Sequence, residues 1–410
     1  MTAKVALIPE YMQNFQCIGP TCEDSCCIGW GVTVKKDEHK KLVNISWTSL
    51  RNKLKSSMRL EEDKKKSNSS YAYMNMDQKS GHCFMLNDQK LCTIHAQLGE
   101  SYLPSVCATY PKIVHLVDGE QECSAVLSCP EAARQALLNP DGIQFYQMDA
   151  INNRNLMTKS NLSTGVGQTH PLYKFFWDIR ITSIEILQDR SISFTHRLII
   201  LGLFCDELQQ MINAGSGESI PEFISKFKES LITNEELRDY EAFPTNPEFQ
   251  LGTLSTILVG NLKLSGSHQR FSDVLSDYLE GIGLNQPNED ILTNFISAYN
   301  NFFAPYAKER EYIFENYAVN YVYSQLFPCD KGMKIFDSYM LLVINFVLIK
   351  MLLIGVSSKY KGLTDEMTIK VIQSYVKIHQ HSGTFANNTF ELLKKENYDT
   401  LGHMSLLIKN

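Results

Sequence analysis

Hydrophobic and polar positions follow different periods in the two parts of the chain. Beyond about residue 171, apolar residues recur every three to four positions, the period of helices that bury one face. Short polar or glycine-bearing breaks such as NAGSGES and GIGLNQPNED separate these segments. The predicted helical segments are 171–213, 218–239, 247–263, 268–282, 288–327, 333–356, 363–381 and 385–396. We therefore expect an all-α domain over the C-terminal two-thirds.

The first third has shorter and more varied elements. Glycine and proline punctuate residues 1–34, which we expect to be looped, and apolar spacing over residues 35–60 predicts one or two short helices. The alternating stretches KIVHLV and QECSAVL flank Asp118-Gly119 and predict a β-hairpin. Asn87-Asp88 predicts a second tight hairpin.

Proline marks two further positions near cysteines. Pro104 and Pro111 flank Cys107 and disfavour a helix there. In contrast, proline and glutamate directly after Cys129 are typical of a helix start, where the helix dipole favours a thiolate.

These patterns predict a mainly α protein with two domains. Residues 1–140 form a small cysteine-rich domain with short β-hairpins, and residues 171–410 form a large α-helical domain. Between them, residues 141–170 are polar and carry glycine, so we expect a linker or an exposed loop.

The longest apolar run, Tyr339 to Val356, is the candidate for a membrane-spanning helix. Asn345 and Lys350 interrupt it, whereas a spanning helix needs about 20 residues with few charges. We interpret it as a buried core helix and expect no membrane span. The opening MTAKVALIPEYMQNF lacks the apolar region of a secretory signal, so we expect a cytoplasmic protein.

Charge narrows the class of partner. The formal net charge is −6 and the isoelectric point is near 6.0, which argues against nucleic-acid binding through a general positive field. The same charge is compatible with a basic or lysine-presenting protein partner.

Cysteine is concentrated in the first third. Nine of the eleven cysteines lie between Cys17 and Cys129. A disulfide framework requires an oxidising compartment, and ordinary buried thiols would be scattered along the chain. The density favours a metal or iron–sulfur site over plain core or redox thiols. Cys123 lies in a strand pattern and is assigned to packing, and Cys129 is a reserve ligand.

Known motifs exclude several enzyme classes. No C-x2-C pair, HExxH, GxSxG, P-loop or GxGxxG occurs in the sequence. Cys22-x3-Cys26 begins like the loop of radical S-adenosylmethionine enzymes, but Gly29 occupies the position of the third cysteine.

The blocks CIGPTCEDSCCIGW, GHCFML, LCTIH, LPSVCATYPK, SCPEAAR and ENYAVNYVYSQLFP resemble the bacterial flagellin lysine N-methylase family. The N-terminal part is also similar to the zinc- or iron-chelating domain named for its CxxCxxCC pattern. The first cysteine group here, Cx4Cx3CC, is wider than that pattern, which weakens the transfer of individual ligands.

The resemblance implies methyl transfer from S-adenosylmethionine to lysine side chains of flagellin. It also implies an iron–sulfur cluster, most simply a four-iron, four-sulfur cluster, with zinc as the alternative. The ligand candidates matched by motif are Cys17, Cys22, Cys26, Cys27, Cys83, Cys92 and Cys107. The preferred four are Cys17, Cys22, either Cys26 or Cys27, and Cys107, because adjacent cysteines are expected to point apart. We expect the cluster to organise the loops of the first domain.

Methylation of lysine requires a neutral amine, since the ammonium has no lone pair. Tyr317, Asn320 and Tyr321 would share a helix face in ENYAVNYVYS and are the catalytic candidates for holding that amine. The alternative is that these tyrosines pack against neighbouring helices. Two other functions compete: a non-catalytic metal-binding interaction protein, and a radical S-adenosylmethionine enzyme.

Overall fold

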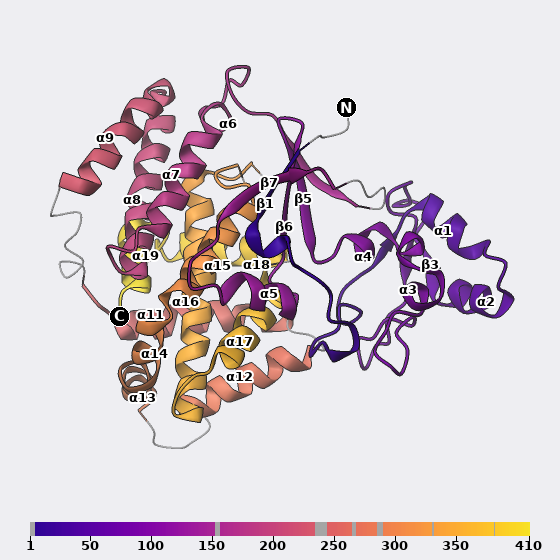
Figure 1. The fold of residues 1–410 in the computed structure, drawn as a ribbon. Helices are drawn as coiled ribbons and strands as arrows, with labels where there is room; N and C mark the ends of the chain where they lie inside the picture. The colour runs from indigo at the N-terminus through magenta and orange to yellow at the C-terminus, as the bar shows by residue number, and fades with distance from the viewer. Residues whose placement is uncertain are drawn as a thin grey trace. The chain divides into compact units, whose positions relative to one another are not determined.

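The computed structural model describes residues 5–151, 156–233, 244–264, 268–284, 290–329, 332–380 and 382–410. The chain divides into two compact units, each described by itself (Figure 1). The first comprises residues 1–132, 145–161 and 266–270, and the second comprises residues 133–144, 162–265 and 271–410.

The first unit contains a five-stranded sheet in the order β7-β1-β6-β5-β8. These strands are β1 (Val5–Pro9), β5 (Lys112–Val117), β6 (Glu120–Ala125), β7 (Phe145–Asp149) and β8 (Thr158–Leu162). β1 pairs in parallel with β6 and antiparallel with β7, and the buried Ala6, Ile8, Val114 and Cys123 pack together on this sheet.

A second sheet in this unit has the order β2-β4-β3 and carries the cysteine-rich region. Its strands are β2 (Thr33–Val34), β3 (Met58–Leu60) and β4 (Ala72–Met74). The short helices nearby in sequence are α1 (Lys36–Val43), α2 (Thr48–Ser56), α3 (Thr93–Leu98), α4 (Ser105–Thr109) and α5 (Pro130–Leu137), the last of which crosses the unit boundary. Leu42, Leu50 and Leu54 of α1 and α2 are buried in a core that includes Cys83.

The second unit is helical and is built around one buried helix. Its first helices are α6 (Pro171–Lys174), α7 (Phe176–Gln188), α8 (Phe194–Asn213), α9 (Ile220–Thr233), α11 (Pro247–Gly260) and α12 (Gln269–Gly281). The later ones are α13 (Ile291–Ala298), α14 (Ala304–Glu309), α15 (Glu311–Ser324), α16 (Ile335–Tyr360), α17 (Asp365–His379), α18 (Gly383–Lys395) and α19 (Leu401–Ile408). A π-helical turn, Tyr299–Phe303, joins α13 to α14.

Helix α16 packs against α8, α11, α15 and α17, which surround it in Figure 1. Within the described residues it is the one helix long and apolar enough to cross a membrane, and its most apolar stretch is entirely buried. The interpretation of Tyr339 to Val356 as a core helix is thus confirmed. Gly281 of α12 and Gly355 of α16 let two helix backbones touch, since a Cβ at Gly281 would lie 1.8 Å from the Gly355 carbonyl oxygen.

A buried ion-pair network joins α7, α8 and α15. The Glu315 carboxylate accepts hydrogen bonds from Arg197 Nη1 at 2.6 Å and from Arg190 Nη2 at 2.9 Å. Arg197 also donates to the Leu187 carbonyl at 2.7 Å and pairs with Glu311. Glu315 and Arg197 are each 1% exposed, so this central pair is desolvated and depends on its internal pairing, whereas the outer partners Arg190 and Glu311 are partly exposed.

The mainly helical fold with a small strand-containing N-terminal region agrees with the sequence prediction. The hairpin at Asp118-Gly119 is confirmed as β5–β6, with positive φ at both turn residues. Helices α1 and α2 confirm the prediction over residues 35–60. The predicted helical ends at 234–239 and 288–289 lie outside the described residues.

Three local predictions are wrong. Residues 1–34 were expected to be looped, but Val5–Pro9 forms β1, because distant strands pair with it on both sides. Residues 141–170 were expected to be a linker or exposed loop, but they contain the edge strands β7 and β8. A helix was not expected at Cys107, but Cys107 lies in the short helix α4. This helix fits between the two prolines, because it begins directly after Pro104 and ends at Thr109, two residues before Pro111.

Candidate functional site

Five cysteines of the first unit line one cavity. They come from four segments that are distant in sequence: the loop before β2, the loop after β4, the start of α3, and α4. The full lining is Cys26, Cys27, Val32, Met74, Cys83, Met85, Cys92, Ile94, Leu103, Pro104 and Cys107. Thiols, two methionine thioethers and aliphatic groups form these walls, so the cavity presents soft ligands in an apolar surround.

Short backbone pairings bring the segments together. The Cys83 N–H donates to the Cys27 carbonyl at 2.8 Å, and an isolated bridge joins Ile28 to His82. A further bridge joins Leu86 to Cys92 across the turn predicted at Asn87-Asp88. The chain therefore places Cys83 and Cys92 together, as predicted, although it does so without regular strands.

Electrostatics in the cavity distinguish one thiol from the others. The pKa of Cys92 is lowered to about 6 by a hydrogen bond from the Cys27 thiol and by the backbone N–H groups of His95 and Ile94. The pKa of Cys27 is raised because its hydrogen bonds to Cys26 and Cys92 favour the protonated form. The hydrogen bond between them therefore favours the thiolate on Cys92 and the protonated form on Cys27.

Cys83 and Cys107 favour the protonated form in this arrangement. Burial raises the pKa of Cys83, and burial followed by the neighbouring sulfurs raises that of Cys107 well above its ordinary value. Among the residues that the structure describes, no three histidine, cysteine, aspartate or glutamate side chains have the arrangement of a metal site. The cavity collects the donors without setting them around one point.

The preferred ligand set does not converge. Cys17 is exposed and Cys22 is half-buried, and neither lines the cavity. Cys22 Sγ donates to the Asp24 carbonyl at 3.2 Å, and nearby Cys17 and Cys22 raise the pKa of Cys129 after the larger effect of burial. Conversely, the adjacent Cys26 and Cys27 were expected to point apart, but both line the cavity.

Two further cysteine predictions have opposite outcomes. Cys123 is fully buried against Ala6, Ile8 and Val114, which confirms a packing role. Cys129 does precede a helix, α5, but burial raises its pKa to about 12. It is therefore a neutral thiol and not the expected thiolate, because desolvation outweighs the helix dipole at this position.

Tyr317, Asn320 and Tyr321 lie on the buried helix α15 of the second unit. Their exposed fractions are 1%, 4% and 6%. The Tyr317 hydroxyl accepts a hydrogen bond from Gln380 Nε2, and burial raises the pKa of Tyr317. The phenol is consequently protonated at neutral pH and acts as a hydrogen-bonding group, not as a base.

The structure adds polar residues beside this trio that the sequence did not single out for function. Tyr375 of α17 lies close enough to Tyr317 and Tyr321 for both to raise its pKa after the larger effect of burial. Its hydroxyl donates to Asn345 Oδ1 at 2.9 Å. Asn345 had one detectable signal in the sequence, since it interrupts the most apolar run of the chain. Together these groups form a buried cluster of hydroxyls and amides, which we call the α15–α17 polar cluster.

Comparison with known proteins identifies the family of this chain. Residues 180–407 match the model of the FliB lysine N-methylase C-terminal domain, which covers more than half of the chain and all of α15, α16 and α17. The chain belongs to the FliB lysine N-methylase family. The family match lies in the helical part, so the likeness of the N-terminal part to the CxxCxxCC domain stays a prediction.

Three similar proteins extend the comparison beyond the helical part of the chain. A lysine-N-methylase of Salmonella choleraesuis is 21% identical over 391 residues, which cover 93% of each chain. A lysine-N-methylase of Salmonella typhimurium is 29% identical over 143 residues, 35% of each chain. The flagellar biosynthetic protein FliU of Salmonella muenchen is 26% identical over 151 residues, which cover 37% of this chain and 88% of FliU. No solved structure matches the chain.

Proposed function

We propose that this chain is an S-adenosylmethionine-dependent methyltransferase that methylates lysine side chains of flagellin in the cytoplasm. The observation that carries the proposal is its alignment with a relative named lysine-N-methylase across 93% of both chains. The name of the flagellar relative FliU and the family match support a flagellar protein as the substrate.

The α15–α17 polar cluster supplies groups that suit a neutral amine. A lysine ammonium that leaves water for such a site loses the hydration that stabilises its charge, so its pKa falls. Protonated phenols at Tyr317 and Tyr321 and the amide of Asn320 would then hold the uncharged amine by hydrogen bonds. Because the pKa of Tyr317 is raised by burial, the proton leaves to solvent or to another group and not to this phenol.

The five-cysteine cavity suits an iron–sulfur cluster, with zinc as the alternative. A four-iron cluster takes four thiolates, and Cys26, Cys27, Cys83, Cys92 and Cys107 supply five candidates with an apolar surround. Cys92 already favours the thiolate form. When bound, the cluster would cross-link the loops that carry these cysteines, which is a structural contribution to the first unit.

Methyl transfer tests the enzymatic proposal. Anaerobically purified protein, flagellin and labelled S-adenosylmethionine should yield methyl-lysine, detected by peptide mass spectrometry. Tyr321→Phe should lower kcat roughly tenfold or more if its hydroxyl holds the amine. The control is Tyr360→Phe, a tyrosine 48% exposed at the end of α16, which should leave kcat unchanged. Absence of methyl-lysine together with absence of cofactor binding by calorimetry would reject the methyltransferase.

A further inference from the structure

Positive charge is concentrated at one end of the first unit. Residues 35–66 contain eleven lysines and arginines but five aspartates and glutamates, a net charge of +6, although the whole chain carries −6. The rest of the chain, with 28 basic and 40 acidic residues, therefore carries −12. Within this segment α1, α2 and β3 lie at the end of the first unit away from the five-stranded sheet (Figure 1). We call residues 35–66 the basic end.

Short contacts join the parts of the basic end. The Lys36 N–H donates to the Asn68 carbonyl at 3.0 Å, which attaches the start of α1 to the loop between β3 and β4. On that loop Lys66 Nζ lies 4.9 Å from the centre of the Tyr71 ring, and the His39 ring of α1 lies 5.2 Å from the same centre. Helix α2 packs against α1. The cations of α1, α2 and the loop therefore share one end of the unit.

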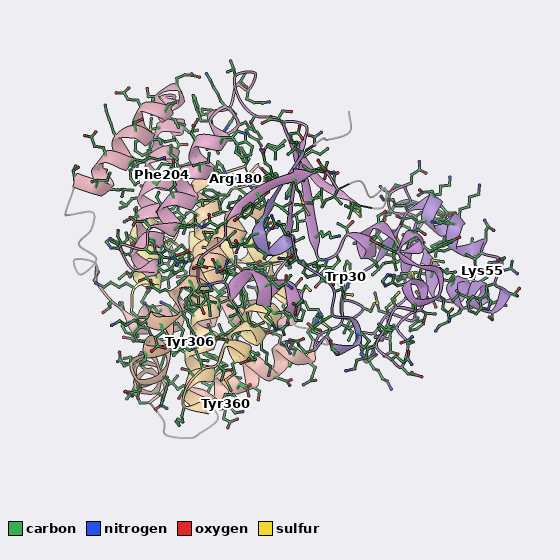
Figure 2. All side chains as sticks on the ribbon, in the orientation of Figure 1. Trp30, Lys55, Arg180, Phe204, Tyr306 and Tyr360 are labelled. Carbon is green, nitrogen blue, oxygen red and sulfur yellow. The ribbon has the colours of Figure 1, made fainter. Side chains whose placement is uncertain are left out.

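Most cations of the basic end face solvent. All of its residues are described, and eight of its eleven cations are exposed: Lys36, Lys40, Lys41, Lys53, Lys55, Arg59, Lys64 and Lys65. Figure 2 shows Lys55 projecting from α2 at the outer end of the unit. One of the acids is used inside the unit, since the Glu38 carboxylate accepts the N–H groups of Lys35 and Ser105, each at 2.9 Å. The excess of positive charge is therefore presented to solvent.

Exposed apolar side chains accompany these cations. Trp47, the N-cap residue of α2, is 50% exposed, and Leu60 of β3 is 52% exposed. Phe84 is 45% exposed and lies beside the end of α2, because its N–H donates to the Asn75 carbonyl and the Asn75 N–H donates to the Ser57 carbonyl. Lysines around exposed tryptophan, phenylalanine and leucine are typical of surfaces that bind where lipid headgroups meet acyl chains.

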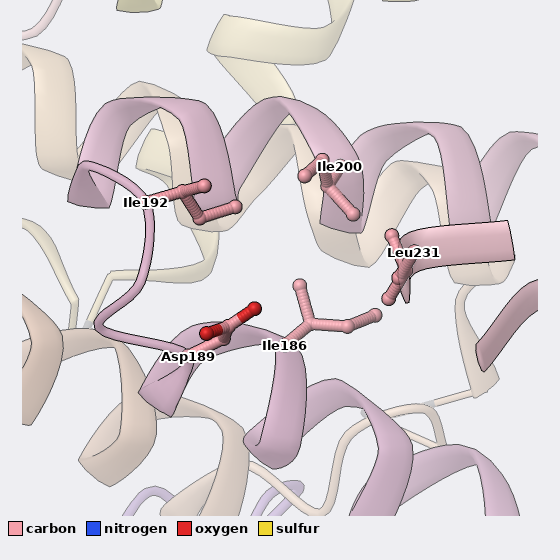
Figure 3. Close-up of a pocket in the computed structure, with 5 residues that line it drawn as sticks. All are labelled: Ile186, Asp189, Ile192, Ile200 and Leu231. Carbon is pink, nitrogen blue, oxygen red and sulfur yellow. The ribbon is translucent and has the colours of Figure 1, made fainter. Parts of the chain in front are cut away.

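The cavity between α7, α8 and α9 of the second unit is not a comparable binding site. It is lined by Ile186, Asp189, Ile192, Ile200 and Leu231 (Figure 3) and holds about one water molecule at most. We interpret it as a gap in helix packing. The basic end, which is an open surface, sets no such limit on the size of its partner.

We propose that the basic end binds the surface of a membrane that contains anionic lipids. Its lysines would be attracted to the anionic headgroups, while Trp47, Leu60 and Phe84 would enter the boundary with the acyl chains. The same membrane repels the charge of −12 on the rest of the chain, so the basic end would face the lipid. This binding is peripheral and requires no spanning helix. It does not depend on the proposed methyl transfer.

Two features favour a lipid surface over a nucleic acid as the partner. Nine of the eleven cations are lysines, which act as point charges, whereas arginine supplies the bidentate contacts that nucleic-acid recognition favours. Leu60 gains free energy by leaving water for lipid, but it has no aromatic face on which a base could stack.

Sedimentation with lipid vesicles tests the membrane surface. The full chain is mixed with vesicles of phosphatidylcholine alone, or with vesicles in which about a third of the lipid is phosphatidylglycerol. It should bind only the anionic vesicles, and less tightly as salt is added. The triple variant Lys36→Gln, Lys55→Gln, Lys64→Gln should bind them at least about tenfold more weakly. Trp47→Ser should weaken binding roughly fivefold, and serine suits the N-cap position of α2.

The matched control is Lys308→Gln, Lys394→Gln, Lys395→Gln, which removes the same charge from exposed positions of the second unit and should bind as the parent does. Circular dichroism of each variant should match that of the parent. No binding to anionic vesicles, equal binding to both kinds of vesicle, or equal losses in the two triple variants would each overturn the proposal. Tighter binding of a single-stranded RNA oligonucleotide than of the anionic vesicles would also overturn it and would assign the basic end to nucleic acid.

Discussion

Cys92 differs from the other cavity thiols because hydrogen bonds from the Cys27 thiol and from backbone N–H groups lower its pKa. We predict that Cys92→Ser abolishes most iron binding by anaerobically purified protein, since serine supplies a poorer ligand and the apolar cavity offers no substitute. Iron and acid-labile sulfide per chain give the measurement. Cys123→Ser is the control, because Cys123 is also buried but lies in the sheet core. Full iron content in Cys92→Ser would remove this residue from the ligand set.

The buried Lys350 makes the stability of the folded protein depend on pH. It is buried within α16, where Nζ donates to the Ile408 carbonyl at 2.7 Å, and desolvation lowers its pKa from 10.5 to about 7. Between these values the unfolded chain binds a proton that the folded chain does not, so this residue makes stability rise with pH. Below pH 7 both states are protonated and the cost of burying the charge is constant.

Replacing Lys350 with an uncharged residue measures its pH-dependent contribution to stability. We expect Lys350→Met to be relatively most stabilising near pH 7 and to lose this advantage progressively by pH 9.5, as measured by urea unfolding at each pH. Lys394→Met, at an exposed position of α18, should keep the pH dependence of the parent. A stability difference between Lys350→Met and the parent that does not change with pH would contradict the lowered pKa.

Sequence spacing alone was insufficient to identify the cysteines of the cavity. The concentration of cysteines predicted a metal or iron–sulfur site, which stays a prediction, but spacing along the chain did not reveal which thiols line one cavity. Cys17 and Cys22 are close to Cys26 in sequence yet do not line the cavity, whereas Cys83 and Cys107 are distant and do. The difference comes from backbone turns and from strand pairing between distant segments, which local spacing does not encode.

Helices α12 and α16 of the second unit approach each other closely through Gly281 and Gly355. A Cβ at Gly355 would lie 2.8 Å from the Tyr278 carbonyl oxygen, so α12 and α16 have no room for a methyl group. We predict that Gly355→Ala destabilises the protein by about 1–3 kcal/mol through overpacking. Gly252→Ala, in α11 with open space around its Cα, should instead stabilise by about 0.5–1 kcal/mol. Chemical denaturation measures both, and equal effects would contradict the close contact.

The ion-pair network of α7, α8 and α15 gives another element-scale prediction. Glu315→Gln leaves Arg197 buried without its main countercharge, so we expect a loss of about 3–5 kcal/mol in the free energy of unfolding. Glu309→Gln breaks an ion pair with Arg310 in which Glu309 is 76% exposed, and should cost at most about 0.5 kcal/mol. Comparable losses in the two variants would mean that the buried network is not energetically distinct.

Elements with strong local patterns were predictable, and those that depend on distant partners were not. The hydrophobic run of α16 and the turn at Asp118-Gly119 specify a core helix and a hairpin by themselves. The strands β1, β7 and β8 are only five residues each. β1 and β7 pair with each other across more than a hundred positions of sequence, and β8 lies beside β5, about 40 positions earlier. Short polar strands such as β8 lack the apolar alternation that would have indicated them.

At the scale of the whole molecule, the two units have different sources of stability. The second unit has a continuous apolar core around α16. The cysteine-rich part of the first unit has short helices, three-residue strands and a smaller core that includes the thiols themselves. A bound metal centre would therefore contribute much of the local stability of residues 26–107 and little to that of α16.

Hydrogen exchange measures the local stability of the two units separately in one sample. We predict that anaerobic removal of the metal increases amide exchange in peptides from residues 26–34 and 83–109, where the cavity thiols lie, because those loops lose their cross-link. Peptides from α16 should exchange at an unchanged rate, since no metal ligand is proposed in that helix and its core is apolar. Cys205→Ser, a buried thiol of α8, provides the control for general loss of cysteine and should leave exchange near the cavity unchanged. Faster exchange in α16 on metal removal would show that the centre also stabilises the second unit, and unchanged exchange near the cavity would contradict the proposed cross-link of those loops.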